Sequence, residues 1–144
     1  MSITFDLPGA QKYAAQGRLE DWIHAYLTAG EWANQPLSDG LKRQARWWAG
    51  PFEIETSRLA RACGPEADME FIMDSASWEE RTSKLAQSLI DLQAVPPLII
   101  EYRAGLLSVR DGNHRLEAMR KKGWRTCWVL VWFNSREDYL DYGR

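Results

Sequence analysis

Apolar residues at helical spacing mark the first ordered segment of the chain. Between residues 17 and 30 they recur every three or four positions: Leu19, Trp22, Ile23, Tyr26 and Leu27. This period places them on one face of an α-helix. Gly30 can end that helix as a C-cap residue. The pattern therefore predicts an amphipathic helix over 17–30 whose role is packing.

Weaker patterns predict two more helices before residue 64. The segment 38–48, capped by Ser38 or Asp39, is expected to be helical. Its basic residues would share one side with tryptophans beside them: Lys42, Arg43, Arg46, Trp47 and Trp48. A further helix is expected over 53–62, closed by the pair Gly64-Pro65. Residues 1–74 are thus predicted to form a mainly helical N-terminal region.

The clearest helix signal begins at Ser77. Ser77-Trp78-Glu79-Glu80 has the pattern of a capping box, in which the serine accepts from the Glu80 backbone N–H and the Glu80 carboxylate reaches back. The following apolar face has helical spacing: Trp78, Thr82, Leu85, Ala86, Leu89 and Ile90. The helix is expected to end near Leu92.

Strand patterns follow this helix. Pro96-Pro97 forces an extended entry into a branched apolar run over 98–102, and a turn over 103–105 leads to a second strand over 106–109, which suggests a hairpin. A helix over 113–122 stops at Gly123, an apolar strand follows over 124–133, and a short helix begins at Ser135. The fold class predicted is α+β, a small mixed sheet with flanking helices over 75–144.

Composition narrows the function classes. A length of 144 residues, 45% of them hydrophobic, suits one domain. A formal net charge of −2 does not mark the whole chain as a nucleic-acid binder. Cys63 and Cys127 lie far apart without nearby histidines, which indicates buried thiols rather than a metal site. With no long apolar segment and no signal peptide, we expect a cytoplasmic protein with no membrane span.

The segment 111–115, Asp-Gly-Asn-His-Arg, carries the candidate chemistry. Gly112 permits a sharp turn between strand and helix, and the unpaired N–H groups of the first helical turn attract anions. Asn113 can cap the helix, and His114 and Arg115 supply donors that suit phosphate. Arg110 borders the turn and either reaches the phosphate or remains solvated. The same residues are also common turn chemistry.

Asp111 decides between binding and catalysis. A carboxylate beside an anion site would repel the anion unless it binds a metal ion, takes a proton or turns away to accept bonds from protein groups. The first two roles are enzymatic, and the third is structural. A Mg²⁺ ion bridged to nucleotide phosphates would suit Asp111 chemically.

The motif and the order of elements resemble the ParB/sulfiredoxin-like superfamily. The resemblance covers residues 78–133, and DGNHRLEAMRKKG is its most specific part. It implies a nucleotide-binding fold in which Gly112, Asn113, His114 and Arg115 hold phosphates, with a nucleoside triphosphate and magnesium as ligands. Arg81 becomes a second phosphate contact if its helix packs over the turn.

The departures from this superfamily narrow the activity. Sulfiredoxins have their catalytic cysteine where this chain has Asn113, which makes sulfinic acid reduction improbable. ParB proteins continue into a helix-turn-helix domain, for which the segment after Phe133 leaves no room. Free amino-acid kinases of the superfamily resemble the chain more closely at the turn, with Asp111 and His114 beside the transferred phosphoryl group. Their acidic base stays open among four residues: Glu70, Asp74, Glu79 and Glu80.

Three functions remain at this point. The first is a nucleotide-binding protein that hydrolyses or transfers a phosphoryl group, with Asp111 and His114 as catalytic residues and Asp111 as the metal ligand. The second is a DNA-binding or nuclease module that uses exposed tryptophans, a basic rim around 120–125 and the face formed by Lys42, Arg43 and Arg46. The third is a non-enzymatic regulator whose Trp-rich N-terminal region contacts a protein partner.

Overall fold

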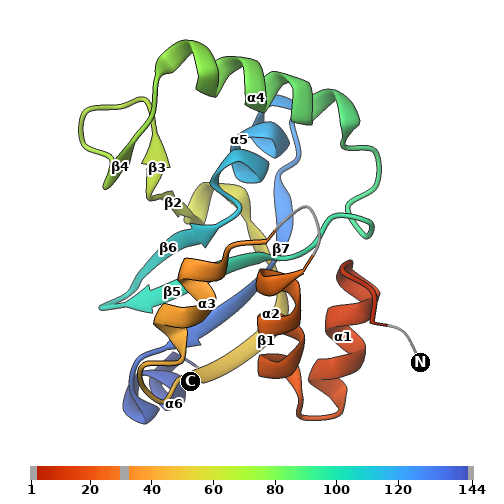
Figure 1. Cartoon of the computed structure of the whole chain (residues 1–144), viewed down its shortest axis with the longest axis vertical. Coiled ribbons are helices and arrows are strands. Elements are labelled where there is room, and N and C mark those ends of the chain that lie inside the picture. The colour runs from red at the N-terminus through yellow and green to blue at the C-terminus, as the bar shows by residue number, and fades with distance from the viewer. Residues whose placement is uncertain (1–2, 30–32, 143–144) are drawn as a thin grey trace.

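The computed structural model of this chain describes residues 3–29 and 33–142. Gly30, the predicted C-cap, lies outside the described residues. A mixed sheet runs through the centre of the molecule with the strand order β1-β7-β5-β6-β2 (Figure 1). Its strands are β1 (Trp47–Glu55), β2 (Ala60–Arg61), β5 (Leu98–Arg103), β6 (Leu106–Asp111) and β7 (Thr126–Phe133). The fold is therefore α+β, as predicted.

The pairing of the strands confirms the predicted hairpin. β5 and β6 are antiparallel neighbours joined by a tight turn, and β5 also pairs with β7 in the parallel direction. β1 pairs with β7 antiparallel, and β2 adds a short parallel edge to β6. A separate two-stranded ribbon consists of β3 (Cys63–Gly64) and β4 (Phe71–Ile72).

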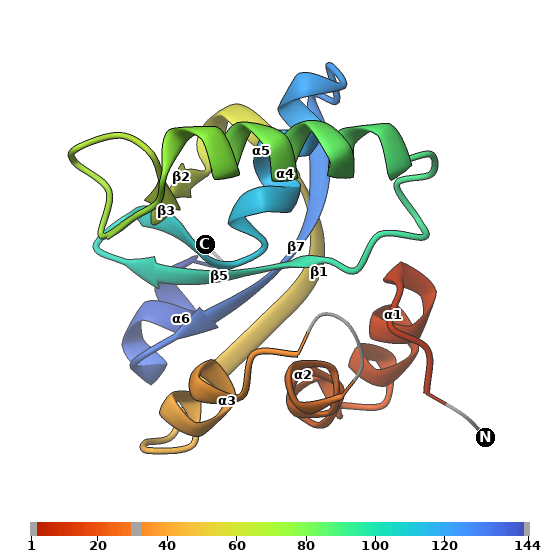
Figure 2. The same ribbon diagram turned by 45° about the horizontal axis from the view of Figure 1, so that its top comes forward.

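Helices cover both faces of the sheet (Figures 1 and 2). One face carries α1 (Leu7–Ala15), α2 (Leu19–Thr28) and α3 (Gln35–Leu41). The other carries α4 (Ser75–Ser88) and α5 (Asn113–Lys121), while α6 (Arg136–Tyr142) packs Tyr139 and Tyr142 against Phe133. Because strand side chains alternate, β7 serves two cores: Val129 and Val131 face one, and Leu130 and Trp132 the other.

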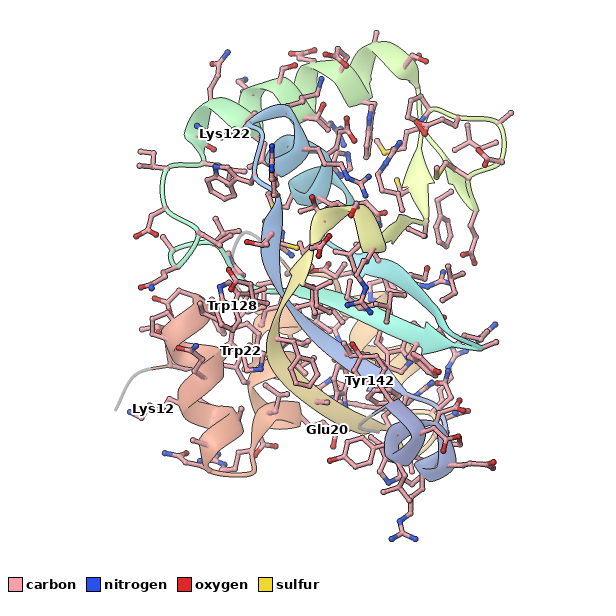
Figure 3. All side chains as sticks on the ribbon, turned by 180° about the vertical axis from the view of Figure 1, so that it is seen from behind. Lys12, Glu20, Trp22, Lys122, Trp128 and Tyr142 are labelled. Atoms are coloured by element: carbon pink, nitrogen blue, oxygen red, sulfur yellow. The ribbon has the colours of Figure 1, made fainter. Side chains whose placement is uncertain are left out.

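The predicted amphipathic helix over 17–30 is α2. All five of its expected apolar residues are buried. Trp22 lies between the N-terminal helices and the sheet (Figure 3), where it is 0% exposed and stacks on Tyr26 at 5.1 Å between ring centroids. This layer fixes Tyr26 beside the turn at residue 111.

The predicted helix over 38–48 is wrong. α3 begins earlier, because Asn34 caps it by accepting from the Leu37 N–H and Pro36 lies in its first turn. Trp47 and Trp48 belong to β1 instead. Lys42 and Arg43 are exposed after the helix end, whereas Arg46 turns back and donates to the carbonyl oxygens of α3. The expected basic helix face is therefore absent from this described segment.

The predicted helix over 53–62 is also wrong. β1 continues to Glu55, a 3₁₀ turn follows at Thr56–Arg58, and β2 comes next. Ile54 is buried while Glu53 and Glu55 are exposed, which is the period of two typical of a strand. Among the described residues before 75, α-helix therefore extends only as far as Leu41.

α4 begins at Ser75, two residues earlier than predicted. Asp74 caps it by accepting from the Ser77 N–H at 2.9 Å, so the expected capping box lies inside the first turn. The helix ends at Ser88 rather than near residue 92. Leu89 is buried, but Ile90 is 89% exposed because the chain has already left the helix.

Candidate functional site

The turn between β6 and α5 has the predicted strand-to-helix geometry. Gly112 adopts φ 105°, in the left-handed region, and is the residue that precedes the helix. Asn113 is therefore the first helical residue rather than its cap. A Cβ at position 112 would lie 2.5 Å from Leu98 Cδ2 and 3.0 Å from Arg115 Nη2. The turn thus requires glycine both for its conformation and for its close packing.

Asp111 turns away from the helix N-terminus and accepts bonds from protein groups. Arg115 Nη2 donates to Asp111 Oδ2 at 2.9 Å, and the Tyr26 hydroxyl donates to the same oxygen at 3.2 Å. Asn34 Nδ2 donates to Oδ1 at 3.3 Å. Burial raises the pKa of the Tyr26 hydroxyl, so the phenol keeps its proton and acts as donor. Of the roles considered for Asp111, namely metal binding, protonation and bonding to protein groups, these contacts correspond to the third.

Arg115 is a buried anchor. Its side chain is 2% exposed, and Nη1 donates to the Pro96 carbonyl oxygen at 2.5 Å. Its guanidinium also lies 5.8 Å from the centre of the Tyr26 ring. These contacts connect the turn to the entry of β5 and to α2. Arg115 lines neither of the two cavities that adjoin the turn, described below.

Asn113 fastens the turn to the β2–β3 segment. Its Oδ1 accepts from the backbone N–H groups of Ala62 at 2.9 Å and Cys63 at 3.2 Å, and its Nδ2 donates to the Val109 carbonyl oxygen at 3.0 Å. The side chain predicted to bind phosphate is thus occupied with backbone groups. What Asn113 can offer a ligand is its position in the first helical turn.

His114 is the motif residue that adjoins both cavities. Its ring packs against Trp78 of α4 with centroids 4.6 Å apart. Nε2 is buried and has no hydrogen-bond partner among the described residues. Burial and then the nearby Arg81 charge lower the pKa of His114, so the imidazole is neutral near pH 7.

His114 should make stability fall as the pH is lowered. A histidine whose folded-state pKa is depressed binds more protons when unfolded, so its contribution is present above pH 6.5 and is lost as pH falls below it. Urea unfolding at pH 7.5, 6.5 and 5.5 should therefore show a smaller decline for His114→Gln than for the unmodified protein. His24, whose pKa burial also lowers, supplies the comparison variant His24→Gln. An unchanged pH slope in His114→Gln would contradict the expectation.

A small cavity, the helix hollow, lies between α4 and the start of α5. It has a volume of about 460 Å³ and is lined by Arg81, Lys84, Leu85, Ser88 and His114. Arg81, Lys84 and Ser88 follow one another at i, i+3 and i+7, so they share one side of α4. The helix that carries Arg81 therefore packs over the turn. A phosphate contact from Arg81 requires this arrangement.

A larger cavity, the sheet groove, lies on the other side of the turn. Its volume is about 1020 Å³, and its lining comes from α3, β4, β5, β6 and the turn itself, including Gly112, Asn113 and His114. Arg110 lies in this groove, paired with Glu70 and, at 3.2 Å, with Glu101. The sequence interpretation missed Glu101, although a single acid inside the apolar run Leu98-Ile99-Ile100 is a visible signal.

The four acids considered as bases have separate positions. Glu70 lines the sheet groove. Asp74 caps α4, Glu79 pairs with Lys121 at 2.6 Å, and Glu80 is exposed on α4. The expected basic rim is also partly occupied, because Arg120 donates to the carbonyl oxygens of Thr56 and Leu59.

The described residues do not fit a protein-bound metal ion. Among residues 3–29 and 33–142, no group of three or more His, Cys, Asp or Glu side chains could hold one. Asp111, the predicted metal ligand, has both oxygens engaged by protein donors. Both cysteines are free thiols, and burial raises the pKa of Cys127 to about 12. A Mg²⁺ ion at the turn would therefore have to be held mainly by oxygen atoms of a bound small molecule.

Comparisons with known proteins come from structure alone, since no family model and no curated protein matches the sequence. Sulfiredoxin from Arabidopsis thaliana matches 65% of this chain and 96% of its own, at 18% identity and a TM-score of 0.39. A Pnob8-like ParB-N domain matches 68% of this chain and 34% of its own, at 16% identity and a TM-score of 0.38.

A third match is the chromosome-partitioning protein ParB from Caulobacter crescentus, C-terminally truncated and complexed with CTP-γ-S. It covers 66% of this chain and 51% of its own, at 17% identity and a TM-score of 0.36. Within the described residues, no helix is long and apolar enough to cross a membrane. The three matched proteins are one sulfiredoxin and two ParB proteins, the two kinds of protein named in the superfamily that the motif resembles.

Proposed function

We propose that this chain binds a nucleoside triphosphate, with the phosphates in the helix hollow. The observation that carries the proposal is the hollow's composition. Two cationic side chains and a hydroxyl on one side of α4 face the first turn of α5: Arg81, Lys84 and Ser88. The positive end of α5 and its outward N–H groups favour an anion at the same place.

The neutral His114 adds a directional contact to this site. Its Nε2 has no partner among the described residues, and its ring orientation is held by Trp78. A small rotation would let a neutral imidazole bond a phosphate oxygen without adding charge. Gly112 lets the chain turn sharply between β6 and α5, which places the first N–H groups of α5 at the site.

The chemistry that follows binding is more restricted than the motif implies. Asp111 holds Arg115, Tyr26 and Asn34, so we assign it a positioning role at the turn and not a metal-binding one. Any Mg²⁺ would arrive with the triphosphate and be held by its oxygens. Hydrolysis or phosphoryl transfer remains part of the proposal, with its acidic base left open, because Glu70 lines the groove on the far side of the turn from the phosphates.

The alternative functions have less support. DNA binding relied on a basic helix face over 38–48 and on a basic rim around 120–125. That helix is not formed in the described chain, and Arg120 of the rim donates to backbone carbonyl oxygens. A Trp-rich contact surface relied on exposed tryptophans, yet Trp22 is 0% exposed and Trp48 packs against Trp132.

Lys84→Met should weaken nucleotide binding about tenfold, because one charge-assisted contact to phosphate is lost. Isothermal titration with ATP, CTP, GTP and UTP in the presence of Mg²⁺ measures the dissociation constants. Lys122→Met is the matched control, since Lys122 is exposed at the far end of α5 (Figure 3). If none of the four nucleotides binds the unmodified protein, or if both variants bind equally well, the proposal is wrong.

A further inference from the structure

We infer that the sheet groove is a second ligand site, which receives an oxyanion, a carboxylate or a phosphate group, at Arg103 and Arg110. The groove and the helix hollow lie on opposite sides of the turn at residues 111–114, with His114 in the lining of both. The inference does not depend on nucleotide binding, because none of its contacts comes from the helix hollow.

The floor of the groove contains a buried carboxylate. Glu101 is 5% exposed, in a strand whose residues Leu98, Ile99 and Ile100 are 0% exposed. Burying a carboxylate is costly unless it is paired and hydrogen-bonded. Glu101 Oε2 accepts from Arg103 and from Asn134, both at 3.0 Å, while Oε1 lies 3.2 Å from Arg110 Nη2.

Packing alone does not call for this cluster. Replacing a buried ion pair by apolar residues of similar size is often neutral or stabilising. Charged groups buried in a groove are therefore a sign of a binding role. Here the effect of Glu101 is to hold two guanidinium groups at the groove, at Arg103 and Arg110.

Three arginines lie around Glu101, although the groove as a whole is not positively charged, because Glu70, Asp111 and Asp138 also line it. Arg46 donates to Asn134, which in turn donates to Glu101, so three arginines lie around one carboxylate. Glu70 offsets part of the charge of Arg110, but its side chain is 55% exposed, and water screens that pair. A bound oxyanion would complete the pairing of Arg103.

Donors for an oxyanion remain in the cluster. The Arg103 side chain is 71% exposed, and its bond within the described chain uses Nη2. Arg110 Nε is buried and has no hydrogen-bond partner among the described residues, so a small shift of the side chain is needed before it can donate to a ligand. Arg46, by contrast, directs its donors to Leu41, Gly40 and Asn134, so it supplies charge but not a contact.

The lining indicates what the rest of the ligand is like. Apolar groups from α3 and β4 border the groove: Pro36, Leu37, Leu41 and Phe71. A volume of about 1020 Å³ is at the upper end for small-molecule sites. The ligand class is therefore an acid with an apolar body, whose acid group pairs with Arg103 and Arg110.

Trp132 provides a direct readout. Its indole N–H donates to Asn134 Oδ1 at 3.2 Å, and Asn134 in turn donates to Glu101. Titration with succinate and, separately, with inorganic phosphate at constant ionic strength should move the Trp132 indole signal in ¹H–¹⁵N NMR spectra, with saturation. Trp132→Phe assigns that signal. Arg103→Gln should weaken the response about tenfold, whereas Arg125→Gln, an exposed change outside the groove, should leave it unchanged.

The outcomes separate the two proposals. Saturation by succinate or by phosphate decides between a carboxylate and a phosphate ligand. A response that persists in Lys84→Met shows that the groove acts without the helix hollow. The inference is overturned if neither probe gives a saturable shift, or if Arg103→Gln responds as the unmodified protein does.

Discussion

Arg115→Met should lower the free energy of unfolding by about 3–5 kcal/mol, the cost of breaking a buried ion pair from one side. The substitution removes donors to the buried Pro96 carbonyl oxygen and to the Asp111 carboxylate, whose side chain is only 12% exposed. Methionine keeps much of the side-chain volume, so the lost contacts and not a cavity dominate the effect. Urea unfolding followed by circular dichroism measures the change.

A double variant tests whether Asp111 is the partner that makes this substitution costly. Asp111→Asn removes the buried charge yet leaves an acceptor for Tyr26 and Asn34, so Asp111→Asn with Arg115→Met should be more stable than Arg115→Met alone. Arg81→Met, on the exposed side of α4, should change stability by less than about 0.5 kcal/mol. A loss below about 1 kcal/mol in Arg115→Met would contradict the anchor role.

The expected instability of Arg115→Met also affects how the motif is tested. In a family motif this arginine is the obvious residue to remove, and loss of nucleotide binding would follow from unfolding alone. Lys84 and Arg81 lie on the exposed side of α4, so they report on binding with little effect on the fold.

Local patterns were sufficient for the second half of the chain. The hairpin of β5 and β6, the glycines that bound α5 and the apolar run of β7 are each encoded within about ten residues. β1 was missed because its alternation is broken: the register shifts between Ala49 and Phe52, next to Gly50-Pro51. Because glycine and proline interrupt the period of two at this point, the segments 38–48 and 53–62 on either side were predicted as separate helices.

The roles of the turn residues could not be predicted because their partners are distant in sequence. Asp111 bonds Tyr26 and Asn34, and Asn113 bonds the backbone at Ala62, so phosphate ligands and structural anchors look identical in the motif. The position of Glu101 beside Arg110 likewise depends on strand pairing. The turn itself was predictable, but the contacts made by each of its side chains were not.

Gly112→Ala should destabilise the protein by about 2–5 kcal/mol. An alanine at φ 105° carries a backbone cost of about 1–2 kcal/mol. Its Cβ would also meet Leu98 Cδ2 at 2.5 Å and Arg115 Nη2 at 3.0 Å, and overpacking of this kind costs about 1–3 kcal/mol. Thermal and urea unfolding give the combined effect.

Gly123→Ala separates the two contributions. Gly123 has φ 77°, also in the left-handed region, but an added Cβ there meets nothing within 4 Å among the described residues. It should therefore cost about 1–2 kcal/mol from the backbone alone. Since the excess in Gly112→Ala measures the contact with Leu98 and Arg115, equal losses in the two variants would mean that the turn has room beside the buried arginine. A larger loss at position 112 would instead support a turn whose inner side is filled by Leu98 and Arg115. A ligand would then approach only from the outer side.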